Sequence, residues 1–408
     1  MFRQPIDFVA RQTRNFKVML VGFGIYVANR SLTETYIPLY VKALGADYVQ
    51  LGWLNSAGTA VNAALSSPLG WIGDRYGMKK VVLLGLMFSI LVPVICLLAI
   101  EWWMLIPAII LSSTSTTLIY VFSDIIFVNN LRGKERATGL GFTRTFSGLL
   151  SIPIPLIAAF IVASFGGISI AGIRPLFYVY LVVVCIVFLL ILTQLKRSNR
   201  KETATTRDSS FSRDFRHLFK EGIPLKRWFL INVSRHFGFG MISPFIPIFA
   251  MEMKGADPFV LGGMDLAMSV VYTIFSIPIG RLVDKIGRKK GIYLTRPFYY
   301  VFLLLLMFAP SSEYLIGAGF FRGLFWASTT LFVTMGMELV PTKLRGRWVG
   351  FNSLLVGFAS LPAPIVGGIL YQVNPLYMFF TAILIDVLFL LPTLATIPET
   401  LNVQLSEG

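Results

Sequence analysis

Charge is scarce in this sequence. Only 14% of the 408 residues are charged and 55% are apolar, whereas about 25% of the residues are charged in an ordinary soluble domain. A single soluble core stops growing near about 250–300 residues, so we expect this chain to place its apolar surface against lipid. The low charge content therefore predicts an integral membrane protein that crosses the lipid bilayer many times.

Cysteine and histidine are also rare. The two cysteines, Cys96 and Cys185, lie inside apolar runs, and the chain has two histidines. These residues offer neither a disulfide framework nor a zinc site, so we expect no metal and no cofactor. The sequence contains no P-loop, no H-E-x-x-H pattern and no nucleophile elbow, so we expect no enzymatic activity.

Apolar runs of the length needed to cross a membrane, about 20 residues, recur along the whole chain. The first run follows a charged segment without a small-residue cleavage site, so we expect a retained helix rather than a signal peptide. The predicted spans are residues 17–41, 49–73, 81–100, 103–127, 137–163, 175–195, 228–251, 258–280, 291–309, 314–340, 348–371 and 376–397.

The basic residues are distributed unevenly between the connections. With the N-terminus in the cytosol, the N-terminal segment and the even-numbered connections hold 28 Lys and Arg, whereas the odd-numbered connections hold three. This is the positive-inside bias. It predicts that both termini are cytosolic, most simply in the plasma membrane, and it accounts for the net charge of +16 without a nucleic-acid partner.

The two halves of the chain repeat each other. The segment SSPLGWIGDRYGMKK (66–80) is identical to SIPIGRLVDKIGRKK (276–290) at seven of fifteen positions, and three other segments recur at offsets of 209–213 residues. We therefore predict two six-helix bundles, residues 1–195 and 228–408, joined by a cytosolic linker, residues 196–227. Within the linker, residues 209–222 carry an apolar helical face opposite a basic one, which predicts a helix in the headgroup layer; a disordered linker is the alternative.

Three features together resemble the major facilitator superfamily. They are the twelve spans arranged as six and six, the long basic central connection, and the pattern G-x-x-x-D-[RK]-x-G-x-[KR]-[KR] after the second and eighth spans. The resemblance covers essentially the whole chain. It implies an all-α membrane fold of two pseudo-symmetric bundles, and a monomeric secondary transporter that moves a small molecule by alternating access.

The repeated segment is expected to hold the cytosolic side closed in one of two conformations. We expect Gly70 and Gly280 at close backbone approaches and Gly77 and Gly287 at tight turns. The resemblance implies that the motif acids cap the eleventh and fifth spans, and that the motif cations pair with Asp124 and Glu338. As the alternative, the cations act only as topology signals. The expected gating residues are Gly70, Asp74, Arg75, Gly77, Lys79, Gly280, Asp284, Lys285, Gly287, Arg288 and Glu338.

Ionisable groups inside spans cost about 2.5–3.5 kcal/mol each, so every one of them is a candidate site residue. The first and seventh spans each carry a polar helical face. We expect proton coupling at Glu34, Asp124 and Asp265, and substrate binding at Tyr26, Asn29, Arg30, Asn232, Arg235, His236 and Arg144.

Some of these residues have simpler interpretations. Arg30 and Glu34 could form a permanent pair that locks the extracellular gate, and His236 could be a hydrogen-bonded packing residue. Asp124 with Arg144, and Asp265 with a nearby arginine, are predicted pairs. The remaining embedded charges, Arg296 and Asp386, fall in spans that the resemblance places at the periphery, so we expect structural roles for both.

Five embedded arginines against four embedded acids favour an anionic or zwitterionic substrate. The carboxylates are the natural proton carriers. The sequence thus favours a proton-coupled secondary transporter of a small organic solute, with export in exchange for protons preferred over uptake. An uncoupled facilitator of the same fold and a non-transporting membrane sensor are the alternatives.

Overall fold

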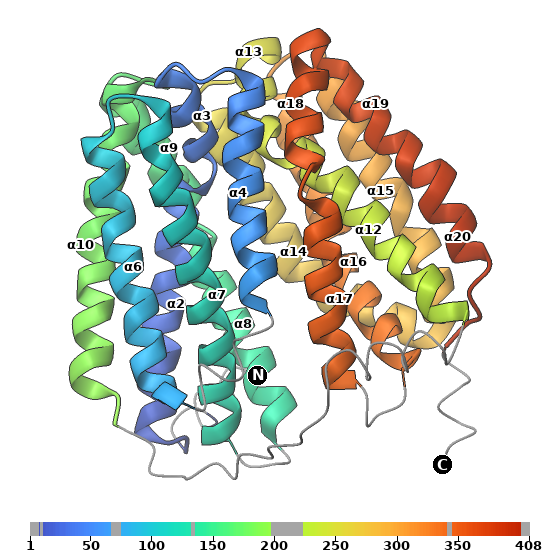
Figure 1. Cartoon of the computed structure of the whole chain (residues 1–408), viewed down its shortest axis with the longest axis horizontal. Coiled ribbons are helices and arrows are strands. Elements are labelled where there is room, and N and C mark those ends of the chain that lie inside the picture. Colours follow the sequence, from blue (N-terminus) through green and yellow to red (C-terminus); the bar gives the residue numbers. More distant parts are fainter. Residues whose placement is uncertain are drawn as a thin grey trace. The chain divides into compact units, whose positions relative to one another are not determined.

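The computed structural model describes Phe8 and residues 11–66, 75–131, 135–196, 223–340 and 345–400. These residues are almost entirely helical and include no β-strand (Figure 1). Gly70 and Asp74 of the first repeated segment, and the residues predicted to form the headgroup helix, lie outside the described residues.

The chain packs as two units. The first comprises residues 1–37 and 68–205, and the second comprises residues 38–67 and 206–408. The second unit thus includes a helix from the N-terminal half, α4 (Tyr48–Ser66), which packs against α17 (Arg345–Ser360) and α18 (Ala363–Val373) (Figure 1).

The first unit is built around a core of phenylalanines, including Phe16, Phe23, Phe122 and Phe127, all at most 2% exposed. The hydroxyl of Thr13 caps its first helix by accepting a hydrogen bond from the backbone N–H of Phe16 at 3.2 Å. Its helices are α2 (Arg14–Glu34), α6 (Met78–Leu98), α7 (Leu105–Asn130), α8 (Arg136–Ser151), α9 (Ile154–Ser164) and α10 (Ile170–Gln194).

The second unit has its core around Trp228, Phe332, Met335 and Leu390. Besides α4, α17 and α18 it contains α12 (Ile223–Ile242), α13 (Ile246–Lys254), α14 (Pro258–Ile286), α15 (Arg288–Phe308), α16 (Tyr314–Glu338), α19 (Pro375–Ile385), a π-helical turn (Asp386–Leu390) and α20 (Leu391–Ala395). A further short helix, α3 (Tyr36–Ala43), follows α2.

Helices occupy the described parts of all twelve predicted spans. Several spans are broken where proline enters, because proline lacks the backbone N–H that a helix interior needs. Pro153 separates α8 from α9, Pro244 separates α12 from α13, and Pro362 separates α17 from α18.

In the part of the chain that the structure describes, nine helical segments are long and apolar enough to cross a membrane. They match nine predicted spans. The other three, at 17–41, 49–73 and 228–251, contain α2, α4 and α12, which are 21, 19 and 20 residues long but more polar. These three helices supply Arg30, Asn55, Thr59, Arg235 and His236 to the sites described below.

Glycines bring α4 and α18 into backbone contact. A Cβ atom on Gly52 would lie 2.5 Å from the carbonyl oxygen of Pro364, and one on Gly368 would lie 2.3 Å from that of Tyr48. Any side chain at either position would separate the helices. The hydroxyl of Ser56 adds a 2.7 Å hydrogen bond to the carbonyl of Leu361. This packing fixes the face of α4 that the second unit uses in its cavity.

Candidate functional site

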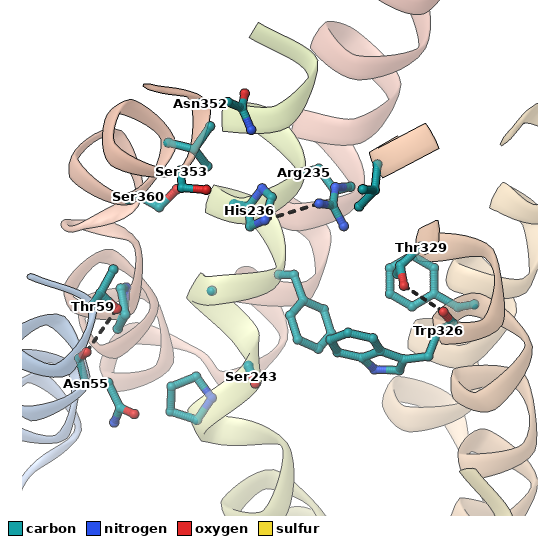
Figure 2. Close-up of a pocket in the computed structure, with 18 of the residues that line it drawn as sticks. Asn55, Thr59, Arg235, His236, Ser243, Trp326, Thr329, Asn352, Ser353 and Ser360 are labelled. Carbon is teal, nitrogen blue, oxygen red and sulfur yellow. Dashed lines mark hydrogen bonds between the residues drawn. The ribbon is translucent and has the colours of Figure 1, made fainter. Parts of the chain in front are cut away.

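A cavity of about 670 Å³ opens within the second unit, between α4, α12, α16, α17 and the start of α18 (Figure 2). Its volume is in the range of small-molecule sites, about 300–1,000 Å³. Aromatic rings of Phe239, Phe325 and Trp326 form one wall, with the Phe239 and Trp326 ring centroids 5.4 Å apart. The polar lining residues are Asn55, Thr59, Arg235, His236, Ser243, Trp326, Thr329, Thr330, Asn352, Ser353 and Ser360.

Arg235 carries the positive charge of this cavity, and no Asp or Glu occurs among its described lining residues. The Nη2 atom of Arg235 lies 3.1 Å from Nε2 of His236, and His236 Nδ1 lies 2.8 Å from the backbone carbonyl of Asn232. Because a carbonyl only accepts, Nδ1 carries the hydrogen, and Nε2 of the neutral ring accepts from Arg235. The nearest partner of Arg235 therefore brings no negative charge.

Three polar atoms in residues that line the cavity lack a hydrogen-bond partner among the described residues: Nε of Arg235, Nε1 of Trp326 and Oγ of Ser360. Buried polar groups of folded proteins are nearly always hydrogen-bonded, so such exceptions need a reason. Each of the three can donate a hydrogen bond. The three atoms are themselves buried, so they are unpaired polar groups beside the cavity rather than donors exposed in it.

A second charged cluster lies behind Arg235. The guanidinium carbons of Arg235 and Arg296 lie 4.8 and 5.1 Å from the centroid of the Phe332 ring. Arg296 Nη2 is 3.3 Å from Oδ1 of Asp386, and the Tyr300 hydroxyl donates to Oδ2 of Asp386 at 2.6 Å. The sequence assigns only structural roles to Arg296 and Asp386. In the structure, Arg296 lies against the ring of Phe325, which lines the cavity.

In the first unit, the polar face of α2 splits into two environments. Arg30 pairs with Glu34 at 3.7 Å, donates to Thr116 Oγ1, and lines a pocket of only about 40 Å³ with Thr33, Ser112 and Tyr180. The other expected binding residues turn into the core. The Tyr26 hydroxyl is 3.4 Å from Ser115 Oγ, and Asn29 Nδ2 donates to the Tyr180 carbonyl at 3.0 Å.

Asn232 is likewise buried. Its amide donates to the carbonyl of Trp228 at 3.3 Å and approaches Oδ1 of Asn352 at 3.4 Å. Of the expected binding residues on α12, the structure thus places Arg235 and His236 at the cavity and Asn232 beside it. The neutral lining residues of α4 and α17 were missed, because isolated Asn, Thr and Ser in apolar runs give no distinguishing signal.

Both predicted pairs of embedded charges are present. Arg144 Nη2 lies 2.6 Å from Oδ2 of Asp124, and Arg322 Nη1 lies 3.2 Å from Oδ1 of Asp265. The first pair corrects one expectation for the repeated segments: Asp124 is bound by Arg144, whereas Lys79 Nζ donates to the backbone carbonyls of Leu192 (2.9 Å) and Leu195. Asp124 lies six residues before the end of α7, about 9 Å inside the helix terminus, and it is Asn129, at that terminus, that contacts Met78 at the start of α6.

The second repeated segment (276–290) forms ion pairs through Arg288. Arg288 pairs with Asp284 and, at 3.3 Å, with Glu338, as the family pattern implied for Glu338. Asp284 is itself 62% exposed, and Lys285 is exposed. Gly287 has φ of 103°, the left-handed conformation that a glycine turn supplies, and Gly77 has φ of 79°.

Two details of this segment differ from expectation. A Cβ atom on Gly280 would meet no described atom within 4 Å, so the predicted close approach is not made there. Glu399, which sequence reasoning passed over, accepts hydrogen bonds from the backbone N–H groups of Arg288 (2.7 Å) and Lys289 (3.1 Å). Its carboxylate thus caps the start of α15, where the helix dipole favours an anion.

Comparison with known proteins identifies the family. The family model described as the Major Facilitator Superfamily matches residues 19–233 and again residues 228–406. The chain belongs to the major facilitator superfamily. It is therefore a multi-pass integral membrane protein of a transporter family, as its apolar helices also indicate.

Two distant relatives match nearly the full length of the chain. An uncharacterized MFS-type transporter of Methanocaldococcus jannaschii is 23% identical over 374 residues, covering 88% of this chain and 89% of the relative. Multidrug resistance protein 2 of Bacillus subtilis is 22% identical, covering 90% of each chain. These relatives are membrane transporters rather than enzymes.

Solved structures of the superfamily share the fold. The nucleoside transporter NupG matches with a TM-score of 0.78 at 15% identity, covering 94% of this chain and 99% of that one. The D-xylose-proton symporter matches with a TM-score of 0.73 at 14% identity, covering 95% and 98%. At such identities the likeness concerns the fold alone.

Proposed function

We propose that this protein is a proton-coupled secondary transporter that carries a small organic solute with an anionic group, free or as part of a zwitterion, by alternating access. The observation that carries the proposal is Arg235: a cation that lines a cavity of about 670 Å³, with a neutral histidine as its hydrogen-bonded partner. A bound carboxylate, sulfonate or phosphate would supply the missing negative charge.

The remaining lining residues support this substrate class. Guanidinium groups bind planar oxyanions through short, charge-assisted hydrogen bonds. Thr59, Thr329 and Ser353 add polar groups to the lining, and the rings of Phe239, Phe325 and Trp326 offer an apolar face for an organic body. A cationic solute would meet Arg235 without any acid in the described lining.

Proton coupling and direction are further parts of the proposal. Embedded carboxylates are available as carriers, and one structural neighbour is a D-xylose-proton symporter. The relative named as a multidrug resistance protein supports export. An uncoupled facilitator would show flux that ignores an imposed proton gradient, and a sensor would show no flux.

Flux in proteoliposomes tests the proposal. We expect naphthalene-1-sulfonate, which stays ionised over the working pH range, to move faster than the neutral sugar xylose and to respond to an imposed pH gradient. Arg235→Gln should lower sulfonate flux by at least about tenfold, the loss of one charge-assisted contact.

The matched control is Arg227→Gln, because Arg227 binds the backbone carbonyl of Thr396 away from the cavity lining. Transport of xylose without transport of the sulfonate would contradict the proposal.

A further inference from the structure

The carboxylate of Asp386 is buried in the last span of the second unit. Asp386 begins the π-helical turn that interrupts the helix between α19 and α20, and π-helical turns occur frequently at functional sites. Its side chain is 6% exposed, whereas Glu34, Asp124 and Asp265 are 64%, 36% and 15% exposed. Of these four embedded acids, Asp386 is the most isolated from water.

Four titratable or charged groups face Asp386 from the elements packed around it. From α15, Arg296 Nη2 lies 3.3 Å from one carboxylate oxygen, the Tyr300 hydroxyl donates to the other at 2.6 Å, and Tyr299 lies within electrostatic range. From α12, Arg235 is also close enough to interact electrostatically. Two arginines therefore share one carboxylate.

Aromatic rings connect this cluster to the cavity. Arg235, which lines the cavity, and Arg296, which pairs with Asp386, both contact the Phe332 ring. Phe325 lines the cavity as well, and its ring centroid lies 5.7 Å from the Arg296 guanidinium carbon. An anion held by Arg235 would thus be one ring away from the Arg296–Asp386 pair.

The charges of the residues in this cluster do not balance. Arg235 and Arg296 contribute two positive charges and Asp386 one negative charge. Arg296 is 3% exposed, yet its Nε and Nη2 atoms form no hydrogen bond with the described residues, although Nη2 lies 3.3 Å from Oδ1 of Asp386. Buried charges are tolerated only when they are paired and hydrogen-bonded. A neutral Asp386 would leave two buried cations facing each other, which is unfavourable unless another anion is present.

We infer that Asp386 takes up the proton that accompanies the substrate, and that anion binding at Arg235 and protonation of Asp386 favour each other. The inference rests on the proposed function of the cavity as an anion site. A hydronium ion from solution gives its proton to Oδ1 of Asp386 and leaves as water. The carboxylate becomes a neutral carboxylic acid, and its ion pair with Arg296 ends. The anion then replaces the lost negative charge, and no electrons move.

Coupling of this sign carries the proton and the anion in the same direction. It differs from export in exchange for protons, the mode that the sequence and the relatives' names favour. It also assigns the coupling role to Asp386 rather than to Glu34, Asp124 or Asp265. By linkage, the proton and the anion must raise each other's affinity by the same factor.

Proton uptake on anion binding tests the inference. The full chain is placed in lipid nanodiscs in weakly buffered solution with a pH-sensitive dye, and naphthalene-1-sulfonate is added. The sulfonate has no proton of its own to exchange in this range, so any uptake belongs to the protein. We expect sulfonate binding to draw protons from solution and to tighten on acidification by up to about tenfold per pH unit, the limit for one linked proton.

Variants assign that proton to a residue. Asp386→Asn should bind the sulfonate without proton uptake and with an affinity that no longer depends on pH. Asp265→Asn, which removes a paired embedded acid of the same unit, should keep both the uptake and the pH dependence. If Asp386→Asn does not fold, Asp386→Glu and Tyr300→Phe decide the matter, because both keep a carboxyl group and should shift the pH midpoint of the uptake.

Several results would overturn the inference. Persistent proton uptake in Asp386→Asn, proton release instead of uptake, or an unchanged midpoint in both Asp386→Glu and Tyr300→Phe would each do so. Failure of the wild-type protein to bind the sulfonate would also overturn it. Gradient-driven flux of a different solute through the wild-type protein would still uphold secondary transport, so the two failures are distinguishable.

Discussion

Arg30 and Arg235 are embedded arginines on the first helices of the two duplicated halves, but the chain treats them differently. Arg30 has a carboxylate partner, Glu34, donates to Thr116, and faces a pocket of about 40 Å³. Arg235 has a neutral histidine, an aromatic ring, an Nε without a described partner, and a cavity of about 670 Å³. The comparison teaches that an embedded charge indicates a ligand site only when its own chain leaves it unbalanced.

The largest expected effect is a loss of stability when the ion pair between Arg296 and Asp386 is broken. Arg296→Gln removes one partner of an ion pair whose side chains are 3% and 6% exposed. We expect it to lower the free energy of unfolding by about 3–5 kcal/mol, because Asp386 is left as an uncompensated buried charge. Thermal unfolding in detergent measures the loss. The double variant Arg296→Gln with Asp386→Asn should recover much of it, and an equal or greater loss in the double variant would contradict the pairing.

The next effect concerns the capped start of α15. Glu399→Ala removes the acceptor for the backbone N–H groups of Arg288 and Lys289. We expect a loss of about 1 kcal/mol in unfolding free energy, typical of a helix N-cap. Glu399→Gln keeps an acceptor oxygen and should lose less, which thermal unfolding of the two variants would show. Identical losses in both would mean that the charge, rather than the hydrogen bond, matters there.

The smallest expected change in stability concerns Arg30, whose charge is paired with Glu34. Glu34 is 64% exposed and Arg30 32% exposed, so their pair should contribute less than about 1 kcal/mol. Glu34→Gln should therefore leave the unfolding temperature nearly unchanged while leaving Arg30 without its carboxylate. If Arg30 then binds naphthalene-1-sulfonate in an Arg235→Gln background, the distinction between the two arginines is set by Glu34. If no binding appears, the small pocket around Arg30 also excludes the ligand.

Much of the fold was predictable because it rests on local patterns. The spacing of apolar runs predicted the helical spans, and the repeated segments predicted the turns at Gly77 and Gly287. Pairs such as Asp124 with Arg144 were predictable because an embedded charge needs an opposite charge nearby. Pro153 and Pro362 are visible in the sequence, but the sequence did not predict that each of them separates two helices.

The rest depends on which helix faces meet, and one sequence does not encode that locally. In the sequence, Phe332 cannot be distinguished from other core phenylalanines. In the structure, α12 and α15 each place an arginine against its ring. The sequence predicts that Asp386 is a peripheral acid. In the structure, it contacts Arg296 and Tyr300 of α15. Asn55 of α4 reaches the cavity because glycines let α4 pack closely on α18.

The most direct test of the account is the affinity of naphthalene-1-sulfonate for Arg235→Gln and for Arg30→Gln, measured side by side in nanodiscs. The account predicts binding at least about tenfold weaker in Arg235→Gln and within about twofold of wild type in Arg30→Gln, the difference that one lost charge-assisted contact makes. Equal losses in the two variants, or wild-type affinity in Arg235→Gln, would contradict it.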